Sequence, residues 1–356
     1  MRHRSGWVVA AAAAASTVGC GGDEACDPAA EVCVLERAVS TIDVPAGVED
    51  EDTCQSWTLN NPTELWVNGI TQHNDGAYHH ANWFFVPDDQ FAVPDGSWRC
   101  SEHQFDEVVA ALLGGYLFAL STQSLGETQT LPAGSAIRIP PYSRVIGSSH
   151  LLNASDQTVS TTMQVALHTI PPPAVKAKLA PARIQYIDLK LDPMQRSSFT
   201  TECLIDTAHQ MNTGQPLQYE LHYTLAHYHS LGVYTQLEIA GGPRDGEVLA
   251  RHDGYGENFG GAIDPPIDLG QIGARGVRFT CGFTNPRNAV VRWGIGDQEM
   301  CVIAIQARTN LGWTGDALRG TGQQVGVGPT GEVHYQAPCS LTAFPWDFEK
   351  RGGPPR

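Results

Sequence analysis

The chain has 356 residues, enough for two ordinary domains, and its composition combines few charges (17%) with many glycines (37) and prolines (23). This composition is typical of a β protein with many turns rather than of a helical one. The formal net charge of −16 excludes nucleic acid as an expected partner, because a phosphate backbone is bound through a basic surface.

The first 20 residues are typical of an export signal. Arg2 and Arg4 precede a short apolar core at 7–15, and small residues lead to Cys20. The ending "STVGC" resembles a bacterial lipoprotein signal, in which the cysteine becomes the lipidated first residue; an ordinary secretory signal is the alternative. Either route exports the chain, and we expect it in the cell envelope, held to the membrane only by a lipid on Cys20.

The chain downstream divides at a proline-rich stretch. Residues 21–50 are polar and acidic and predict a tether, whereas short apolar runs from 51–172 predict an N-terminal β-sandwich. Within that sandwich, 160–170 alternates like a strand and 105–113 has the pattern of a short helix. The stretch 171–181 is proline-rich, so we expect a semi-rigid link that does not continue a sheet.

Strand patterns resume after the prolines, from 173–343, and a tail follows at 344–356. Turn signals such as "GPRDGE" and "TNPRNA" separate the strands. The expected fold is all-β, with two tandem antiparallel jelly-roll-like β-sandwich domains.

Cysteine usage agrees with export. An even number remains after Cys20, which fits disulfides in an oxidising compartment, although spacing alone leaves their connectivity open. No two of them form a CxxC pair, so a structural zinc site is not indicated. They stand at positions 26, 33, 54, 100, 203, 281, 301 and 339.

The stretch "LHYTLAHYHSLGVYTQLEI", 221–239, predicts one β-strand whose buried face is interrupted by two histidines. Its odd-numbered residues are apolar or aromatic except for Thr235 and the pair His227 and His229. Two imidazoles on a buried face need polar partners, because an unpaired buried polar group is costly in free energy. A metal ion satisfies both at once; two separate hydrogen-bond partners are the alternative.

Three other features are candidate ligands, each with an ordinary alternative. His79 and His80 in "AYHHANWFF" could share an ion at a bulge or through different ring nitrogens, or form a surface pair. His150 lies in "VIGSSHLLNAS" and could simply be hydrogen-bonded. Met300 in "GDQEMC" lies in an apolar run and could be core filler.

The order of these motifs resembles that of the copper type II, ascorbate-dependent monooxygenases, the family of peptidylglycine α-hydroxylating monooxygenase and dopamine β-monooxygenase. The resemblance runs from about Cys54 to Cys339 and is densest at "HHANW", "HYHSLG" and "GDQEMC". It implies two copper ions, one in each domain. The implied ligands are His79, His80 and His150 for the first copper, and His227, His229 and Met300 for the second.

The resemblance also implies the activity. The copper held by His227, His229 and Met300 would bind O2 and abstract hydrogen from an unactivated C–H, so these are the expected catalytic residues. The other copper would store an electron, and ascorbate or a similar reductant would reduce both. The ligand types agree, because a thioether favours Cu(I) and imidazoles suit a copper that changes oxidation state.

The disulfide pairing follows from the same resemblance. It implies Cys54–Cys100 around the HH pair, Cys281–Cys301 beside Met300, and Cys203–Cys339 across the second domain, and it leaves Cys26–Cys33 as a local pair.

Departures from the family concern the substrate. Leu225 stands where the peptide-hydroxylating members carry a carboxylate-binding arginine, and Val302 and Ala304 stand where they carry asparagine and tyrosine. We therefore expect a small neutral or hydrophobic substrate. The alternative function is an exported copper-binding lipoprotein that stores or senses copper without catalysis. A bicupin is disfavoured, because Glu238 lies too far beyond His229 for a cupin motif.

Overall fold

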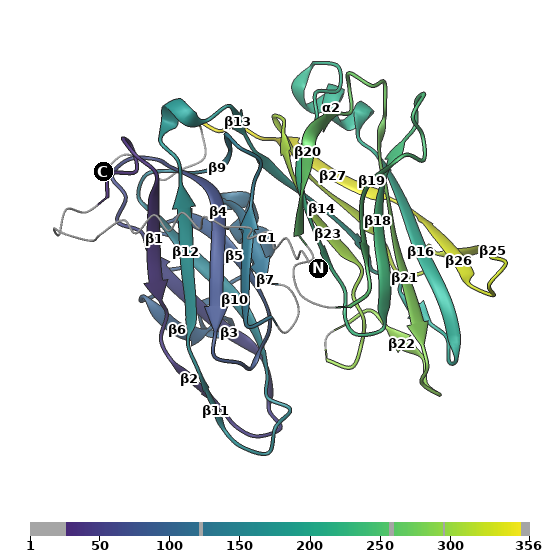
Figure 1. Ribbon diagram of the computed structural model, residues 1–356, viewed down its shortest axis with the longest axis horizontal. Helices are drawn as coiled ribbons and strands as arrows, with labels where there is room; N and C mark the ends of the chain where they lie inside the picture. Colours follow the sequence, from purple (N-terminus) through teal and green to yellow (C-terminus); the bar gives the residue numbers. More distant parts are fainter. Residues whose placement is uncertain (1–25, 121–123, 256–259, 295, 350–356) are drawn as a thin grey trace, which may run out of the picture.

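The computed structural model describes residues 26–120, 124–255, 260–294 and 296–349. The expected signal peptide with Cys20, the first part of the expected tether and the end of the tail lie outside these residues. Two β-sandwiches lie side by side, the first in purple to teal and the second in teal to yellow (Figure 1).

The first sandwich contains strands β1 to β13, and the expected short helix is present as α1. Their bounds are β1 Cys33–Ala38, β2 Ile42–Val44, β3 Glu49–Thr58, β4 Leu65–Asn74, β5 Tyr78–Pro87, β6 Gly96–Arg99, η1 Ser101–His103, α1 Glu107–Leu113, β7 Gly115–Leu120, β8 Gly126–Thr130, β9 Ser135–Ile139, β10 Ser143–Leu152, β11 Val159–Thr161, β12 Met163–Thr169, η2 Pro172–Ala174 and β13 Ala177–Lys178. One sheet has the order β1-β12-β4-β9-β13, with β8 also on β4, and the other has the order β6-β3-β10-β5-β7.

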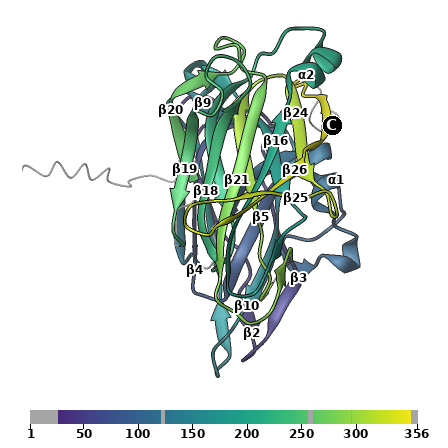
Figure 2. The ribbon, with the colours of Figure 1, turned by 90° about the vertical axis from the view of Figure 1, so that its right-hand side faces the viewer.

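The second sandwich contains strands β14 to β27 and helix α2. Their bounds are β14 Ala180–Tyr186, β15 Lys190–Leu191, β16 Gln195–Leu204, α2 Asp206–Thr213, β17 Glu220–His227, β18 Gly232–Ala240, β19 Val248–Asp253, β20 Gly260–Asp268, β21 Gly276–Asn285, β22 Val291–Arg292, β23 Val302–Arg308, β24 Leu311–Ala317, β25 Gln323–Val327, β26 Val333–Pro338 and β27 Ser340–Pro345. The sheet β20-β17-β23-β14-β24-β27 faces the first sandwich, and the sheet β19-β18-β21-β16-β26-β25 lies on the far side, toward the viewer in Figure 2.

The all-β fold with two tandem, mainly antiparallel jelly-roll-like sandwiches is therefore confirmed. Strand β12 alternates as expected, with Met163, Val165 and Leu167 buried. Helix α1 begins after Asp106, whose side chain accepts a hydrogen bond from the Val109 amide. No helix among the described residues is long and apolar enough to cross a bilayer.

Four disulfides lie in the described residues, and they are the pairs that the resemblance implies. They are Cys26–Cys33, Cys54–Cys100, Cys203–Cys339 and Cys281–Cys301. Disulfides of this number indicate an oxidising, exported environment.

The expected tether and tail differ from the structure in their bounds. The expected tether, 21–50, contains β1 and β2, which pair with β12 and β11. Their acidic residues concealed them, because a strand at a sheet edge exposes many side chains to water and tolerates charge. The tail begins later than 344, since β27 runs to Pro345 and Trp346 is buried.

The proline-rich stretch 171–181 also continues the sheets, contrary to expectation. Its first prolines form the 3-10 turn η2, after which Ala177 and Lys178 pair in parallel with β9. Pro181 lies in β14 opposite Gln306, one residue before the pairing with β24 begins. Its missing amide hydrogen therefore removes no bond from that second ladder.

Candidate metal centre

The HH pair lies on β5, where that strand meets β10 at a bulge. His150 is directly opposite His80, but Leu151 is opposite Tyr78, so His79 is the extra residue of the bulge. The bulge lets neighbouring histidines approach the same place, which a regular strand forbids. The His79 and His150 ring centroids are 4.9 Å apart, and His150 Nδ1 lies 3.2 Å from His80 Nε2.

The HxH pair does not lie in one long strand, which corrects the expectation for 221–239. Strand β17 ends at His227, and after a turn the chain enters β18 in the opposite sheet at Gly232. The face of β17 that carries Leu225 is directed at the first sandwich and lines the interdomain space, instead of facing the core of its own sandwich. The histidines are thus delivered to the interface between domains.

Glu299 holds the turn that follows His227. Its buried carboxylate accepts the backbone amide hydrogens of His229 (2.8 Å) and Leu231 (2.7 Å). Burial raises the pKa of Glu299 to about 7, partly opposed by these amide donors. Glu299 directly precedes Met300, so one side chain links the HxH turn to the segment that carries the methionine. This role of Glu299 was not predicted from the sequence, although Glu299 belongs to the "DQEMC" motif that drew attention to Met300.

The five histidines form one cluster between the two sandwiches. The ring centroids of His80 and His227 are 4.9 Å apart, and those of His79 and His229 are 5.2 Å apart. Two overlapping triplets have ligand nitrogens within 4.8 Å of one another. These triplets are His79, His80 and His150, and His80, His227 and His229.

The ring nitrogens of the cluster suit metal binding. Both nitrogens of His79 and Nε2 of His229 are buried without a hydrogen-bond partner among the described residues. His229 Nδ1 donates to the Gln298 carbonyl oxygen at 2.8 Å, which leaves the lone pair on Nε2. His150 Nε2 donates to Glu49 Oε1 at 3.0 Å, which leaves its Nδ1 lone pair toward His80.

The electrostatics of the cluster favour neutral imidazoles. Burial, helped by the neighbouring His229 and His150, lowers the pKa of His79 to about 3. Burial also lowers the pKa of His80, His227 and His229. A neutral imidazole is the form that coordinates a metal, so the cluster is electrostatically prepared for a cation.

Met300 lies on the wall of a cavity of about 330 Å³ that His80 and His227 also line. The first sandwich contributes Asn82 and α1 residues to this cavity, and the second contributes strands β14, β23 and β24. Cys301, which follows Met300, is fixed to β21 through its disulfide with Cys281. Three of the six predicted ligands thus line the cavity, and the other three, His79, His150 and His229, lie with His80 and His227 in the histidine cluster.

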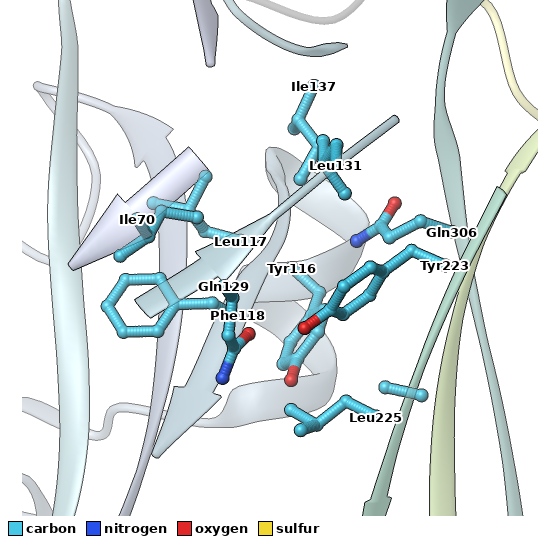
Figure 3. A pocket seen from close by; sticks show the side chains of 11 residues that line it. Ile70, Tyr116, Leu117, Phe118, Gln129, Leu131, Ile137, Tyr223, Leu225 and Gln306 are labelled. Carbon is cyan, nitrogen blue, oxygen red and sulfur yellow. The ribbon is translucent and has the colours of Figure 1, made fainter. Parts of the chain in front are cut away.

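A second, smaller cavity of about 20 Å³ adjoins the first (Figure 3). Tyr116, Leu225 and Ala304 line both cavities. The Tyr116 and Tyr223 rings lie close together in Figure 3, and the Gln306 amide points between them and Leu131. Both polar atoms of Gln306 are buried without a partner among the described residues, and the space suits one ordered water.

His222 lies close to the HxH pair in the sequence but does not contact it. Its Nε2 donates to Glu220 at 2.9 Å, and its Nδ1 lies 2.7 Å from the Ser135 hydroxyl of the first sandwich. It contacts the neighbouring domain and not the cluster. Glu49 and Arg183, by contrast, belong to the site region and were not anticipated, because neither lies near a histidine motif in the sequence.

Comparisons with known proteins indicate only remote similarity. No family model matches the chain, and no curated protein matches it. Similar solved structures include the major capsid protein P2 of bacteriophage PM2 (10% identity, 78% of this chain and 97% of that chain, TM-score 0.29). A chain of the Sulfolobus turreted icosahedral virus matches at 9% identity over 75% of this chain and 60% of its own, with a TM-score of 0.21. At these values the similarity indicates no function.

Proposed function

We propose that the chain is an exported dicopper monooxygenase that hydroxylates an unactivated C–H of a small substrate with O2 and an ascorbate-type reductant. The observation that supports this most is the buried five-histidine cluster beside Met300. Structural histidines are normally hydrogen-bonded, whereas both ring nitrogens of His79 lack any partner among the described residues. Such a cluster is better explained by metal ligation than by folding.

The donor set fits copper. His79, His80 and His150 offer an all-nitrogen site, and His227, His229 and Met300 offer two nitrogens and a thioether. Copper bound there would supply one-electron redox chemistry and activation of O2. The protein keeps the imidazoles neutral by burial and orients two of them through the Gln298 carbonyl and Glu49.

The cavity supports a substrate with an apolar body. Leu225, Val302 and Ala304 form an apolar wall next to His227, and several aromatic side chains line other parts of the cavity. Such a wall excludes water from the reacting C–H and orients the substrate by contact. We also propose that the exported chain stays in the cell envelope, where a lipid on Cys20 anchors it.

Copper stoichiometry tests the proposal. We expect two coppers per purified chain, and one in each of Met300→Ile and His150→Ala. Carbon monoxide binding to the Cu(I) form should be lost only in Met300→Ile, because a thioether-ligated Cu(I) is the expected O2 site. His150 is preferred to His80 for substitution, because His80 belongs to both ligand triplets.

The exposed His73 on β4 provides a matched control, and His73→Ala should retain both coppers. Binding of one metal ion only, or of zinc in place of copper, would overturn the two-site mechanism. Two coppers without O2- and ascorbate-dependent hydroxylation of any substrate in a broad screen would favour the non-catalytic copper-binding lipoprotein.

A further inference from the structure

The interdomain cavity contains a cation that forms no ion pair among the described residues, although Glu107 across the cavity attracts it. Arg183 of β14 lines the cavity, is half-buried, and makes no hydrogen bond or ion pair with any residue that the structure describes. A guanidinium that is partly removed from water without a partner is costly in free energy. A bound anion would remove that cost.

A hydroxyl group lies on the same face of the sheet, one strand away from Arg183. Thr314 of β24 is the direct neighbour of Arg183 in the parallel ladder, so both residues lie on the cavity face of the sheet. Thr314 Oγ1 is buried without a hydrogen-bond partner among the described residues. A planar fork of N–H donors next to an O–H donor matches the two oxygens of a carboxylate.

We propose that Arg183 and Thr314 bind the carboxylate of a small, otherwise apolar substrate. This inference deepens the proposed function and depends on it only for the oxidation step, since carboxylate binding needs no copper. It replaces the neutral substrate expected from the sequence. That expectation rested on Leu225, Val302 and Ala304, whereas the structure brings Arg183 next to Ala304 from a strand far away in the sequence.

Glu107, on the opposite wall of the cavity, attracts Arg183 but forms no ion pair with it. Its two carboxylate oxygens accept hydrogen bonds from the Asn82 amide at 3.2 and 3.3 Å, within the first sandwich. Burial raises the pKa of Glu107, and the attraction of Arg183 lowers it only in part. The alternative is a substrate whose ammonium group binds Glu107. The experiment below distinguishes a carboxylate substrate from an ammonium substrate.

The sheet register sets the size of the substrate. His227 and Gln185 both lie opposite Val302, and Arg183 is two residues along from Gln185. Strand spacing of about 4.8 Å and a rise of about 3.4 Å per residue place the Arg183 and His227 Cα atoms about 12 Å apart. The oxidised carbon therefore lies several bonds from the carboxylate. Val302 and Ala304 of β23 line the cavity between β14 and β17, so an apolar or aryl group fits there.

Isothermal titration calorimetry on the copper-free mature chain tests this proposal with three probes of the same shape. These are 3-phenylpropanoate, 3-phenylpropanamide and 3-phenylpropylammonium. A charge-assisted bidentate bond should make the acid bind at least about tenfold more tightly than the amide. Arg183→Met should abolish this preference, and Arg183→Lys should retain it at lower affinity, because the charge stays but the fork is lost.

The exposed Arg319 lies in the loop after β24, and Arg319→Met should leave the acid preference unchanged. Equal affinity for acid and amide, tighter binding of the ammonium probe, or an acid preference that survives Arg183→Met would each overturn the proposal. If the chain binds the acid selectively but takes up no copper, the carboxylate site is supported and the monooxygenase function is rejected. The failure of one proposal is therefore distinguishable from the failure of the other.

Discussion

At the scale of single residues, the candidate metal centre depends on side chains that fix its ligands. Glu49 accepts the Nε2–H of His150 at 3.0 Å, which determines the nitrogen that His150 presents to the other histidines. It reaches across the interface as well, because a Cβ on Gly296 of the second sandwich would lie 2.9 Å from Glu49 Oε1. Glu49 is therefore a positioning residue for His150.

We expect Glu49→Ala to weaken copper binding at the site of His79, His80 and His150 by about 10- to 100-fold, the usual effect of losing a ligand's outer hydrogen-bond partner. Glu49→Gln should recover much of the loss, since its amide oxygen still accepts from His150. Chelator competition measures the affinity. Glu51 is the control: its carboxylate lies near His150 without bonding to it, and Glu51→Ala should bind copper normally.

At the scale of elements, α1 closes the outer face of the sheet that carries the HH pair. Ala110 packs with Phe84 and Ile146 in a small apolar cluster, so β5 and β10 are covered on both faces. The same helix directs Glu107 toward Asn82, two residues after His80. A short surface helix thereby places a buried carboxyl group in the wall of the cavity.

The pH dependence of stability should report this burial. The pKa of Glu107 is raised above its ordinary value of 4.5 in the folded state, so the folded state binds the proton more tightly than the unfolded state. The resulting stabilisation is fully present below about pH 4.5 and is lost as the pH rises through the raised pKa. Glu107→Gln removes this dependence. Its free energy of unfolding in urea should therefore increase relative to wild type as the pH rises above 4.5.

Glu102 provides the comparison for this measurement, because it is exposed in η1, and Glu102→Gln should follow wild type at every pH. If the difference between Glu107→Gln and wild type stays constant from pH 4.5 to pH 7.5, burial of the carboxyl group is not the cause of its behaviour.

At the scale of the whole molecule, the five-histidine cluster forms only while the two sandwiches are closed. His79 and His229 come from different domains, yet their rings are 5.2 Å apart. A polar chain links the domains elsewhere: Ser135 contacts His222, which donates to Glu220, and Glu220 is ion-paired with the exposed Arg308. Because Ser135 and His222 are buried, these two groups depend on each other for hydrogen bonding.

Removing the cross-domain link should loosen closure. In Ser135→Ala, His222 Nδ1 is left buried without its hydroxyl partner, at a cost of about 1–3 kcal/mol in the free energy of unfolding. Small-angle X-ray scattering should therefore show a larger radius of gyration. Thr200→Ala, which breaks a Thr–Thr contact on the far sheet, should leave the radius unchanged. An unchanged radius in Ser135→Ala would mean that apolar packing alone sets the closure.

Much of this protein follows from the sequence alone. Alternation and turn signals determine an all-β chain, since the side-chain period of a strand is local. The HH, HxH and methionine motifs indicated the ligand types, because donor chemistry belongs to the residue. The bounds of β1 and of the strand that ends at His227 could not be predicted from the sequence. Pairing at a sheet edge and a change from one sheet to another do not alter the hydrophobic pattern of the chain.

Only the tertiary structure decided how these parts meet. The bulge at His79, the turn held by Glu299 and the domain interface bring five histidines into one cluster. Arg183 reaches the cavity from a strand that is neighbour to β23 in space and distant from it in sequence. Ligand identity is a local property of the chain, but the distance between ligands, their partners and the charge of the cavity depend on long-range register and packing.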